Sequence, residues 1–346
     1  MSDVKAVFPM PDSEKTGVAA ALARIPSGTP LVAIVGATAS GKSDLGISLA
    51  REFNGEIISA DSRQVFRGLD LGTGKVEGPL DVARGRDVPV HDRTYRMAPL
   101  ISEGIGHWVI DVADAREIFT AAEFQVLAYD AMADIVARGR LPLLVGGTGL
   151  YLRAVTDGLV MPSVPPNPAL RAAIEHLDAA TLRARLLALD PDAGAFVDLQ
   201  NPRRMVRAIE VASVAGPLAT SRGISQVPFR TLTLGVEVER AALLERIRVR
   251  LLARLDAGMV DEVRRLHAEG LSHERMEDLG LEYRAISRFL RGVYGHEEMV
   301  DELGRAIARF ARRQATWFRK YGNVRWISTP QEAHDAVANF LEQNKL

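Results

Sequence analysis

The stretch that decides the fold runs from residue 31 to residue 43 and reads LVAIVGATASGKS. Residues 31–35 are a short apolar run typical of a buried strand, and the amphipathic residues 42–53 predict a helix. Between them, residues 36–43 match the pattern G-x-x-x-x-G-K-[ST] in the strand, loop and helix context that this motif requires. The glycines let successive backbone N–H groups face an anion, and the helix N-terminus adds positive potential. The stretch therefore predicts a phosphate-binding loop at the edge of an α/β sheet.

We call residues 36–43 the phosphate loop and expect it to bind a di- or triphosphate. Lys42 reaches the terminal phosphates, and the Ser43 hydroxyl can ligate Mg²⁺, the one cofactor that we expect. The alternative is a glycine-rich turn that only joins strand to helix. The motif does not identify the molecule that carries the phosphates. The diphosphate-binding residues predicted here are Gly36, Ala37, Thr38, Ala39, Ser40, Gly41, Lys42 and Ser43.

Further apolar runs at residues 56–60, 108–112 and 141–145 predict strands, and residues 121–138 carry a helical pattern. Strands that alternate with helices are typical of a parallel sheet. We therefore expect an α/β fold whose main domain is a P-loop NTPase-like parallel sheet flanked by helices. Two more short strands are expected at residues 231–236 and 324–327.

The remaining segments differ in composition and predict the domain organisation. Residues 1–30 are rich in Ala and Pro and predict a loosely ordered lead-in. Residues 159–228 follow a wholly helical pattern after a Pro-rich opening, which predicts an inserted helical subdomain within a core of residues 31–158 and 229–346. Residues 76–106 are polar and contain Gly, Pro and both charge signs, so they predict an insertion or a long surface loop.

The composition is that of a globular protein, with 47% hydrophobic and 25% charged residues. No apolar run is long enough to span a membrane, and no apolar signal segment opens the sequence. Cysteine is absent, which excludes thiolate metal sites and fits a reducing compartment. We expect a cytoplasmic monomer that does not bind membranes. The net charge of −1 gives no overall attraction to nucleic acid, so an RNA partner requires locally clustered arginines.

Asp61 follows the second predicted strand, at the carboxyl edge of the sheet where α/β proteins bind ligands. It should therefore lie near the phosphate loop. A carboxylate there can hold Mg²⁺ or accept a proton from an incoming nucleophile. The spacing leaves open the alternative that Asp61 is an N-cap for the following segment.

Several blocks of sequence resemble tRNA dimethylallyltransferases and occur in the order found in that family. They are the phosphate loop and residues 61–65 (DSRQV), 70–75 (DLGTGK), 146–151 (GGTGLY) and 312–318 (RRQATWF). This combination is more specific than a phosphate loop alone. The resemblance implies that dimethylallyl diphosphate occupies the loop, that N6 of adenosine 37 in the tRNA anticodon loop attacks the allyl carbon, and that diphosphate leaves.

The same resemblance implies roles for individual residues. Asp61 is the catalytic base that acts on a weakly nucleophilic amine, while Lys42 and Thr148 stabilise the departing diphosphate. Thr148 also matches a position that contacts tRNA, and a helix N-cap is its alternative. Arg171 matches a tRNA-contacting arginine, where a solvated helix residue is the alternative, and residues 201–207 (NPRRMVR) resemble a segment that touches tRNA. The tRNA contacts implied are Asp61, Ser62, Arg63, Gln64, Thr148, Arg171, Arg203, Arg204 and Arg207.

A basic segment near the C-terminus gives a separate reason to expect RNA. Residues 303–331 contain no Asp or Glu, and Arg305, Arg309 and Arg313 recur every four residues while apolar residues take the complementary period. One helix can then bury one face and offer the other to phosphates. A solvated basic face is the alternative. We expect Arg309 and Arg313 to contact tRNA.

The sequence departs from the family pattern at several places. Phe66 stands where Tyr is common, and residues 280–284 (GLEYR) are a variant of a Gly-Tyr-Lys-Glu-like segment. Residues 198–200 (DLQ) replace a usual His-Pro-Asn start, and residues 76–106 are longer than usual. These changes avoid the expected catalytic residues.

Three other functions fit part of the sequence. An ATP-dependent small-molecule kinase shares the phosphate loop, with residues 109–111 (VID) as a strand that ends in a Mg²⁺ ligand, but it does not explain the basic helix. A prenyltransferase that acts on free adenine nucleotides keeps the chemistry and does not need the basic surfaces. An RNA-binding protein without catalysis does not need Asp61 beside a phosphate site.

Overall fold

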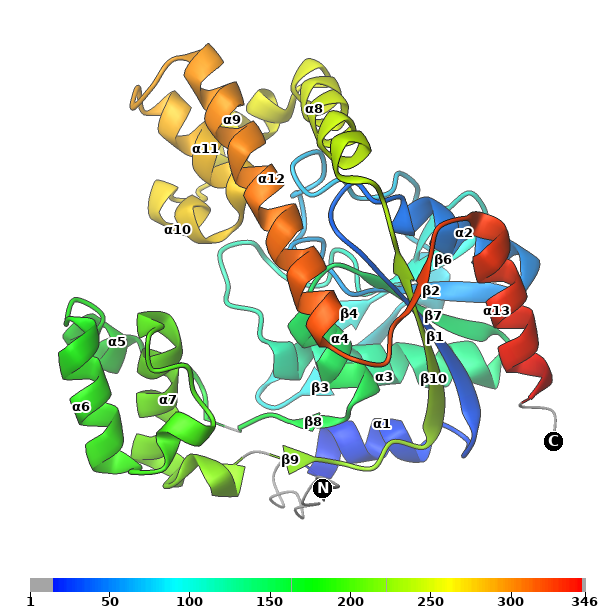
Figure 1. The fold of residues 1–346 in the computed structure, drawn as a ribbon, viewed down its shortest axis with the longest axis horizontal. Coiled ribbons are helices and arrows are strands. Elements are labelled where there is room, and N and C mark those ends of the chain that lie inside the picture. Colours follow the sequence, from blue (N-terminus) through cyan, green and yellow to red (C-terminus); the bar gives the residue numbers. More distant parts are fainter. Residues whose placement is uncertain (1–14, 163, 222, 344–346) are drawn as a thin grey trace. The chain divides into compact units, whose positions relative to one another are not determined.

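The computed structural model describes residues 15–162, 164–221 and 223–343, which Figure 1 traces. The chain divides into two compact units, which we call the core unit (Ala20–Leu152 and Pro228–Leu346) and the helical unit (built on Arg153–Val227). Residues 1–14 of the predicted lead-in lie outside the described residues. The end of that lead-in belongs to the core unit instead, because α1 (Ala20–Ala23) packs on α3 (Ala121–Ala137) and the first strand begins at Thr29.

A seven-stranded sheet forms the centre of the core unit. Its order is β11-β10-β1-β7-β2-β6-β5, and every neighbouring pair is parallel except β5 with β6. The mostly parallel sheet with helices around it confirms the predicted fold class. The strands are β1 (Thr29–Val35), β2 (Gly55–Ser59), β5 (Leu100–Ser102), β6 (Ile105–Trp108), β7 (Leu141–Gly146), β10 (Phe229–Val236) and β11 (Arg325–Ile327).

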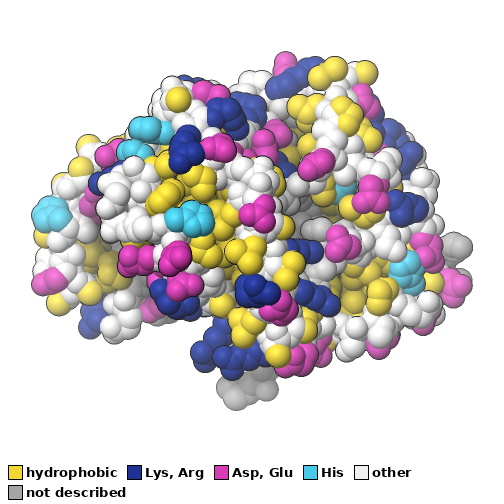
Figure 2. All heavy atoms as spheres, turned by 90° about the horizontal axis from the view of Figure 1, so that it is seen from above, with side chains coloured by type: hydrophobic (Ala, Val, Ile, Leu, Met, Phe, Trp, Pro, Cys, Tyr) yellow, Lys and Arg dark blue, Asp and Glu magenta, His cyan; other side chains and the backbone are white. Residues whose placement is uncertain are grey.

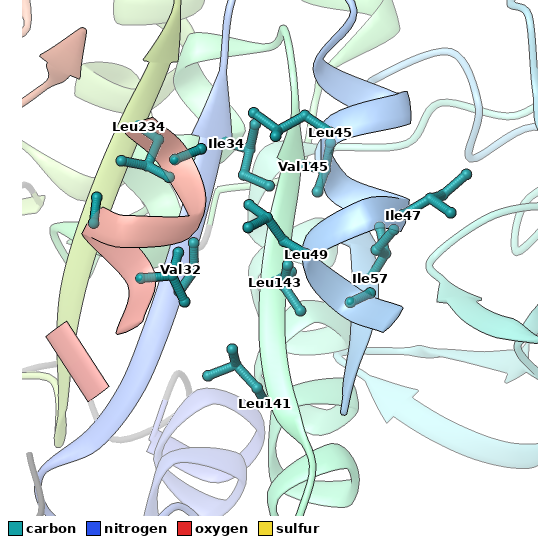
Figure 3. Close-up of a cluster of buried hydrophobic side chains, with 14 of the residues drawn as sticks. Val32, Ile34, Leu45, Ile47, Leu49, Ile57, Leu141, Leu143, Val145 and Leu234 are labelled. Carbon is teal, nitrogen blue, oxygen red and sulfur yellow. The ribbon is translucent and has the colours of Figure 1, made fainter. Parts of the chain in front are cut away.

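Two helices, α2 (Lys42–Glu52) and α13 (Pro330–Glu342), cover one face of this sheet. Alternate strand residues such as Val32 and Leu143 point toward them and join Leu49 of α2 in one buried apolar cluster, which Figure 3 shows. Each fully buried aliphatic side chain there contributes about 1.5–3 kcal/mol relative to an exposed one. Helix α3 packs on β2 and β7 and takes no part in the cluster, so it covers the opposite face.

Of the two alternatives for residues 76–106, an insertion or a long surface loop, the loop is wrong. They contain η2 (Val82–Arg84), an antiparallel hairpin of β3 (Arg86–Val90) and β4 (Arg93–Met97), and the edge strands β5 and β6. Only alternate residues of the hairpin are apolar, so the segment as a whole has the polar composition of a loop. Those buried residues are Val88, Val90, Tyr95 and Met97.

The strand predicted at residues 108–112 is also displaced, because β6 ends at Trp108. Val109 and Asp111 adopt positive φ angles of 61° and 55°, which lie outside the extended region of backbone conformation. An apolar run alone could not reveal these turns.

Glu56 of β2 is a buried charge that joins several elements of the core unit. The residue is 1% exposed, and its carboxylate accepts hydrogen bonds of 2.7 Å from Trp108 Nε1, Arg84 Nη2 and Arg138 Nη1. Burial by itself raises the pKa of this carboxyl group, but the hydrogen bonds from Arg138, Trp108 and Arg84 outweigh it, and the pKa is lowered. Glu56 therefore ties β2 to η2, to β6 and to the end of α3.

The helical unit has its own apolar core. It contains α5 (Pro168–Ile174), α6 (Ala179–Leu189) and α7 (Pro202–Ala215), which bury residues such as Leu182, Leu186, Met205 and Ile209. Asn167, Asp178 and Asn201 cap the three helices by accepting backbone N–H groups. The prediction of a wholly helical segment was wrong in one respect: β8 (Leu159–Val160) and β9 (Gly223–Ile224) pair antiparallel.

Among the described residues, five helices lie between β10 and β11 in the core unit. No helix among the described residues is long and apolar enough to cross a membrane. The five are α8 (Arg240–Asp256), α9 (Met259–Ala268), α10 (His273–Asp278), α11 (Leu281–Leu290) and α12 (His296–Lys320).

Replacing Glu56 by Gln should lower the free energy of unfolding by about 3 kcal/mol near neutral pH, because three donors lose a charged acceptor. Since the folded-state pKa of Glu56 lies below the unfolded value of about 4.3, this stability is present above that pH and is lost as the pH falls through the folded pKa. Urea titrations of the wild-type protein and the Glu56→Gln variant should therefore show a difference in the free energy of unfolding at neutral pH. This difference should become smaller in acid.

The control variant is Glu103→Gln, which removes an exposed partner of Arg51. Its cost should be at most about 1 kcal/mol. Equal effects from the two variants would contradict the structural role of Glu56.

Candidate active site

The phosphate loop leaves the carboxyl end of β1 and enters α2. Ala39 and Gly41 adopt positive φ angles of 63° and 94°, which curl the backbone. A Cβ atom on Gly36 would lie 2.6 Å from Ser40 Oγ, so the close approach requires glycine. Ser40 is 4% exposed, and its hydroxyl has no hydrogen-bond partner among the described residues. The loop thus holds a buried polar group that a bound ligand can satisfy.

Lys42 is the cationic centre of this loop, and its Nζ donates a hydrogen bond to Ala37 O at 3.3 Å. Burial lowers the pKa of the ammonium group, Asp61 raises it, and Arg250 and Arg254 of α8 lower it again, with a net decrease. Like charges therefore meet around Lys42. An anion bound beside them would relieve that repulsion.

Asp61 lies just past the carboxyl end of β2, as predicted. Its Oδ1 accepts the backbone N–H of Arg63 at 2.8 Å, so Asp61 caps the turn that follows, and no helix starts there among the described residues. The backbone N–H of Ser62, the residue between Asp61 and Arg63, donates to Thr148 Oγ1 at 3.1 Å. In return, the backbone N–H of Thr148 donates to Ala60 O at 3.2 Å. The loops after β2 and β7 are therefore joined, and Asp61 and Thr148 belong to the same cluster.

Gln314 of α12 is a site residue that had no role assigned from the sequence. Its Oε1 accepts the backbone N–H of Thr38 at 2.8 Å, and its Nε2 donates to Gly147 O at 2.9 Å. A Cβ atom on Gly147 would lie 2.4 Å from Gln314 Nε2, and one on Gly149 would lie 2.6 Å from the Trp317 ring. The block 312–318 therefore braces the phosphate loop against the loop after β7.

A pocket opens beside Thr38 and Ala39, the middle of the phosphate loop. Its lining combines the charged side chains of Arg250, Arg254 and Glu282 with aliphatic ones. Such a pocket suits a ligand that carries both negative charge and hydrocarbon. The aliphatic residues are Ile247, Leu251, Met259 and Ile307.

Glu262 of α9 organises the segment 70–75. It is 7% exposed and accepts the backbone N–H groups of Asp70, Leu71 and Gly72, at 3.2, 2.7 and 3.2 Å. The Tyr283 hydroxyl also donates to it at 2.7 Å. Burial first, and then Glu262, raise the pKa of Tyr283 well above its ordinary value, so this phenol stays protonated.

Lys75 is the last residue of the same segment, and its side chain is 4% exposed. Its Nζ donates to Phe66 O at 2.7 Å and to Asp70 Oδ1 at 2.8 Å, and it also forms an ion pair with Asp111. Asp111, the Mg²⁺ ligand that the kinase alternative requires, is therefore paired with a lysine beyond the end of β6.

Gln64 and Arg63 make contacts within the protein. Gln64 accepts a hydrogen bond from Ser59 Oγ at 2.8 Å and donates to Gly74 O at 3.3 Å. Burial lowers the pKa of the Arg63 guanidinium, and the carboxylate of Asp61 acts against that decrease. Both residues were predicted to contact tRNA, and Gln64 holds segment 70–75 in place.

In the helical unit, Arg171 and Arg207 bind the carboxylate of Glu210, which is 1% exposed. Arg171 Nε lies 2.7 Å from Oε1, and Arg207 Nη1 lies 3.1 Å from Oε2. Burial by itself raises the pKa of Glu210, but the donors, Arg171 first, outweigh it and the pKa is lowered. Of these two predicted tRNA contacts, Arg171 therefore also holds α5 to α7, while Arg207 pairs with Glu210 within α7.

The basic face of α12 is less positive than the sequence suggested. Glu302 lies one position before the segment free of acidic residues, and it pairs with Arg305 at 3.4 Å and with Arg309 at 2.9 Å. Helical spacing brings residue 302 next to 305 and 309, so the expectation of an uncompensated face was wrong. The Arg313 guanidinium lies 5.7 Å from the centre of the Phe310 ring. On the face drawn in Figure 2, acidic side chains also lie among the basic ones.

The core unit thus brings together the phosphate loop, Asp61, Ser62, Arg63 and Thr148, while Arg171, Arg203, Arg204 and Arg207 belong to the helical unit. Within the described ranges, no group of three or more His, Asp or Glu side chains could hold a metal ion. The Ser43 side chain is exposed next to Lys42.

Known proteins are similar to this chain in sequence and in fold. A family model described as IPP transferase matches residues 93–321, and one described as isopentenyl transferase matches residues 29–136. The chain is 45% identical to tRNA dimethylallyltransferase 2 of Syntrophotalea carbinolica, over 84% of this chain and 90% of that protein. It is 42% identical to the tRNA dimethylallyltransferase of a Roseiflexus species, over 88% and 94%.

Solved structures give the same result. The full-length tRNA isopentenylpyrophosphate transferase of Bacillus halodurans is 32% identical with a TM-score of 0.64, over 91% of this chain and 98% of that one. A eukaryotic dimethylallyltransferase acting on tRNA shares the fold at 23% identity and a TM-score of 0.64, over 87% and 74%. With a site that unites a phosphate loop and a carboxylate, this chain belongs to the tRNA dimethylallyltransferase family.

Proposed function

We propose that this chain transfers the dimethylallyl group of dimethylallyl diphosphate to N6 of adenosine 37 in the anticodon loop of tRNA. The observation that carries this proposal is the set of hydrogen bonds by which Gln314 and Thr148 join the phosphate loop, the loop after β7 and the loop that carries Asp61. One site then holds both the leaving group of the donor and a base for the acceptor.

The phosphate loop binds the diphosphate. As the C–O bond of the donor breaks, negative charge accumulates on the leaving diphosphate, and groups already aimed at it lower the barrier. The loop N–H groups, Lys42 and Arg250 supply that stabilisation. The aliphatic side chains of the neighbouring pocket, such as Ile247 and Leu251, suit the hydrocarbon part of the donor.

Asp61 is the base. The lone pair of adenine N6 forms the new C–N bond to the allyl carbon, and Asp61 accepts the proton that N6 releases. The hydrogen bond from Ser62 N to Thr148 Oγ1 fixes the loop that carries Asp61. The same bond places the Thr148 hydroxyl within this cluster, where we propose that it stabilises the departing diphosphate and contacts tRNA.

Mg²⁺ fits the residues of this loop. Its coordination is often completed by substrate phosphate oxygens and water, so a single protein oxygen such as Ser43 Oγ suffices without a carboxylate cluster. When bound, the ion neutralises charge on the diphosphate.

The helical unit supplies tRNA contacts through Arg203 and Arg204 of α7, whose side chains are exposed. Arg171 and Arg207 also present cationic groups, although Glu210 compensates part of their charge. Arg313 and Arg309 of α12 add positive charge in the core unit. An enzyme that acts on a stacked base must draw that base out, which requires a grip on the surrounding loop.

Residues of a single core unit make up the whole catalytic cluster, which supports a monomeric enzyme. Both proposed substrates are cytoplasmic molecules, which supports a cytoplasmic location. The deciding experiment incubates the protein with Mg²⁺, labelled dimethylallyl diphosphate and either tRNA or adenine nucleotides. Label in tRNA is expected, label in nucleotides would favour the free-nucleotide prenyltransferase, and phosphate transfer from ATP would favour a kinase.

Asp61→Asn should reduce the turnover number for tRNA prenylation by about 10²–10⁴-fold, because the amide cannot accept the proton. The Michaelis constant for dimethylallyl diphosphate should stay within about threefold, since the phosphate loop is untouched. Asp87→Asn, which changes an exposed carboxylate paired with Arg96, is the control and should leave turnover unchanged. Full activity of the Asp61 variant would refute its role as base.

Reversing the charge of both Arg203 and Arg204 to Glu should weaken tRNA binding about tenfold or more at low salt and reduce the salt slope by about two. The control is Arg264→Glu on α9, an exposed arginine paired with Asp261. Filter binding over a series of salt concentrations measures both quantities. If the double variant binds tRNA with the same affinity and the same salt slope as the wild-type protein, α7 makes no phosphate contacts.

A further inference from the structure

The pocket beside the phosphate loop contains a carboxylate that the proposed mechanism does not use. Glu282 is the second residue of α11, and its side chain lines the pocket together with Thr38 and Ala39. A negative charge next to an anion-binding loop weakens the binding of anions. Such a repulsive group can make the site discriminate between ligands.

The surroundings of Glu282 hold it near the site. A Cβ atom on Gly280 would lie 3.8 Å from both Glu282 Oε2 and Arg63 Nε, so carboxylate and guanidinium approach the same point. Burial first raises the pKa of Glu282, Arg254 and Arg63 lower it, and Asp61 raises it, with a net increase. Glu282 therefore shares its surroundings with two guanidinium groups and with the proposed base.

Arg254 lines the same pocket. A Cβ atom on Gly74 would lie 1.8 Å from Arg254 Nη2, so the guanidinium rests on the glycine backbone. Among the described residues, its guanidinium donates no hydrogen bond to a protein acceptor. The pocket therefore offers a cation that attracts phosphate and a carboxylate that limits how much negative charge can enter.

We propose that Glu282 is a specificity-determining residue that restricts the site to diphosphates by repelling a third phosphate. A phosphate loop by itself accepts di- and triphosphates alike. Glu282 lines the pocket together with Thr38 and Ala39, so a third phosphate that entered this pocket would lie beside its carboxylate. This inference rests on the proposed function, because it assumes that the loop binds diphosphate.

The test measures the dissociation constants of inorganic pyrophosphate and inorganic tripolyphosphate by calorimetry, in wild-type protein and in Glu282→Gln. Wild-type protein should prefer pyrophosphate. The substitution should shift the ratio toward tripolyphosphate by about tenfold or more, since one like-charge repulsion is removed. Glu282→Ala serves as a second variant in case the amide disturbs the fold.

Arg254→Met is the matched control within the same pocket. It should weaken both ligands by about tenfold or more while leaving their ratio near the wild-type value, because it removes an attraction common to both. If the ratio of the two dissociation constants were unchanged in both Glu282 variants, the role of Glu282 would be overturned and the proposed function would stand. Failure of wild-type protein to bind pyrophosphate would overturn the proposed diphosphate site, and this inference with it.

Discussion

Two hydrogen bonds of Gln314 hold the site of this protein together. The side chain reaches from α12 to Thr38 in the phosphate loop and to Gly147 after β7. The carboxyl ends of parallel strands meet at one edge of a sheet, but the loops beyond them have no fixed relation without such a brace. The bond from Ser62 to Thr148 joins the third loop, so Asp61, Thr148 and Lys42 form one cluster.

Buried glutamates make a second constraint that recurs through the molecule. Glu56, Glu210 and Glu262 are almost wholly buried and accept several donors each. Removing one partner from such a group is costly because a charge is left buried without compensation. Arginines that bind these glutamates are therefore partly structural, and a count of arginines in the sequence overestimates the surface that RNA can use.

The phosphate loop, the position of Asp61 and the parallel sheet could be predicted because local patterns determine them. The phosphate loop needs glycine at fixed spacing, and Asp61 needs only to follow a buried strand. The brace by Gln314 and the pairing of Glu302 with Arg309 could not be predicted so simply. The first joins residues far apart in the chain, and the second lies just outside the segment that appeared free of acids. The hairpin within residues 76–106 was hard to predict, because only alternate residues of its strands are apolar and its overall composition is that of a polar loop.

The closeness of Lys42 and Asp61 couples the two halves of the proposed reaction. Without a donor, Lys42 is the cation that partly compensates the Asp61 carboxylate. A diphosphate bound to Lys42 takes over that positive charge and adds negative charge next to Asp61. The leaving group and the base of the proposed reaction therefore share one electrostatic environment, in which an excess of phosphate beside Glu282 is also unfavourable.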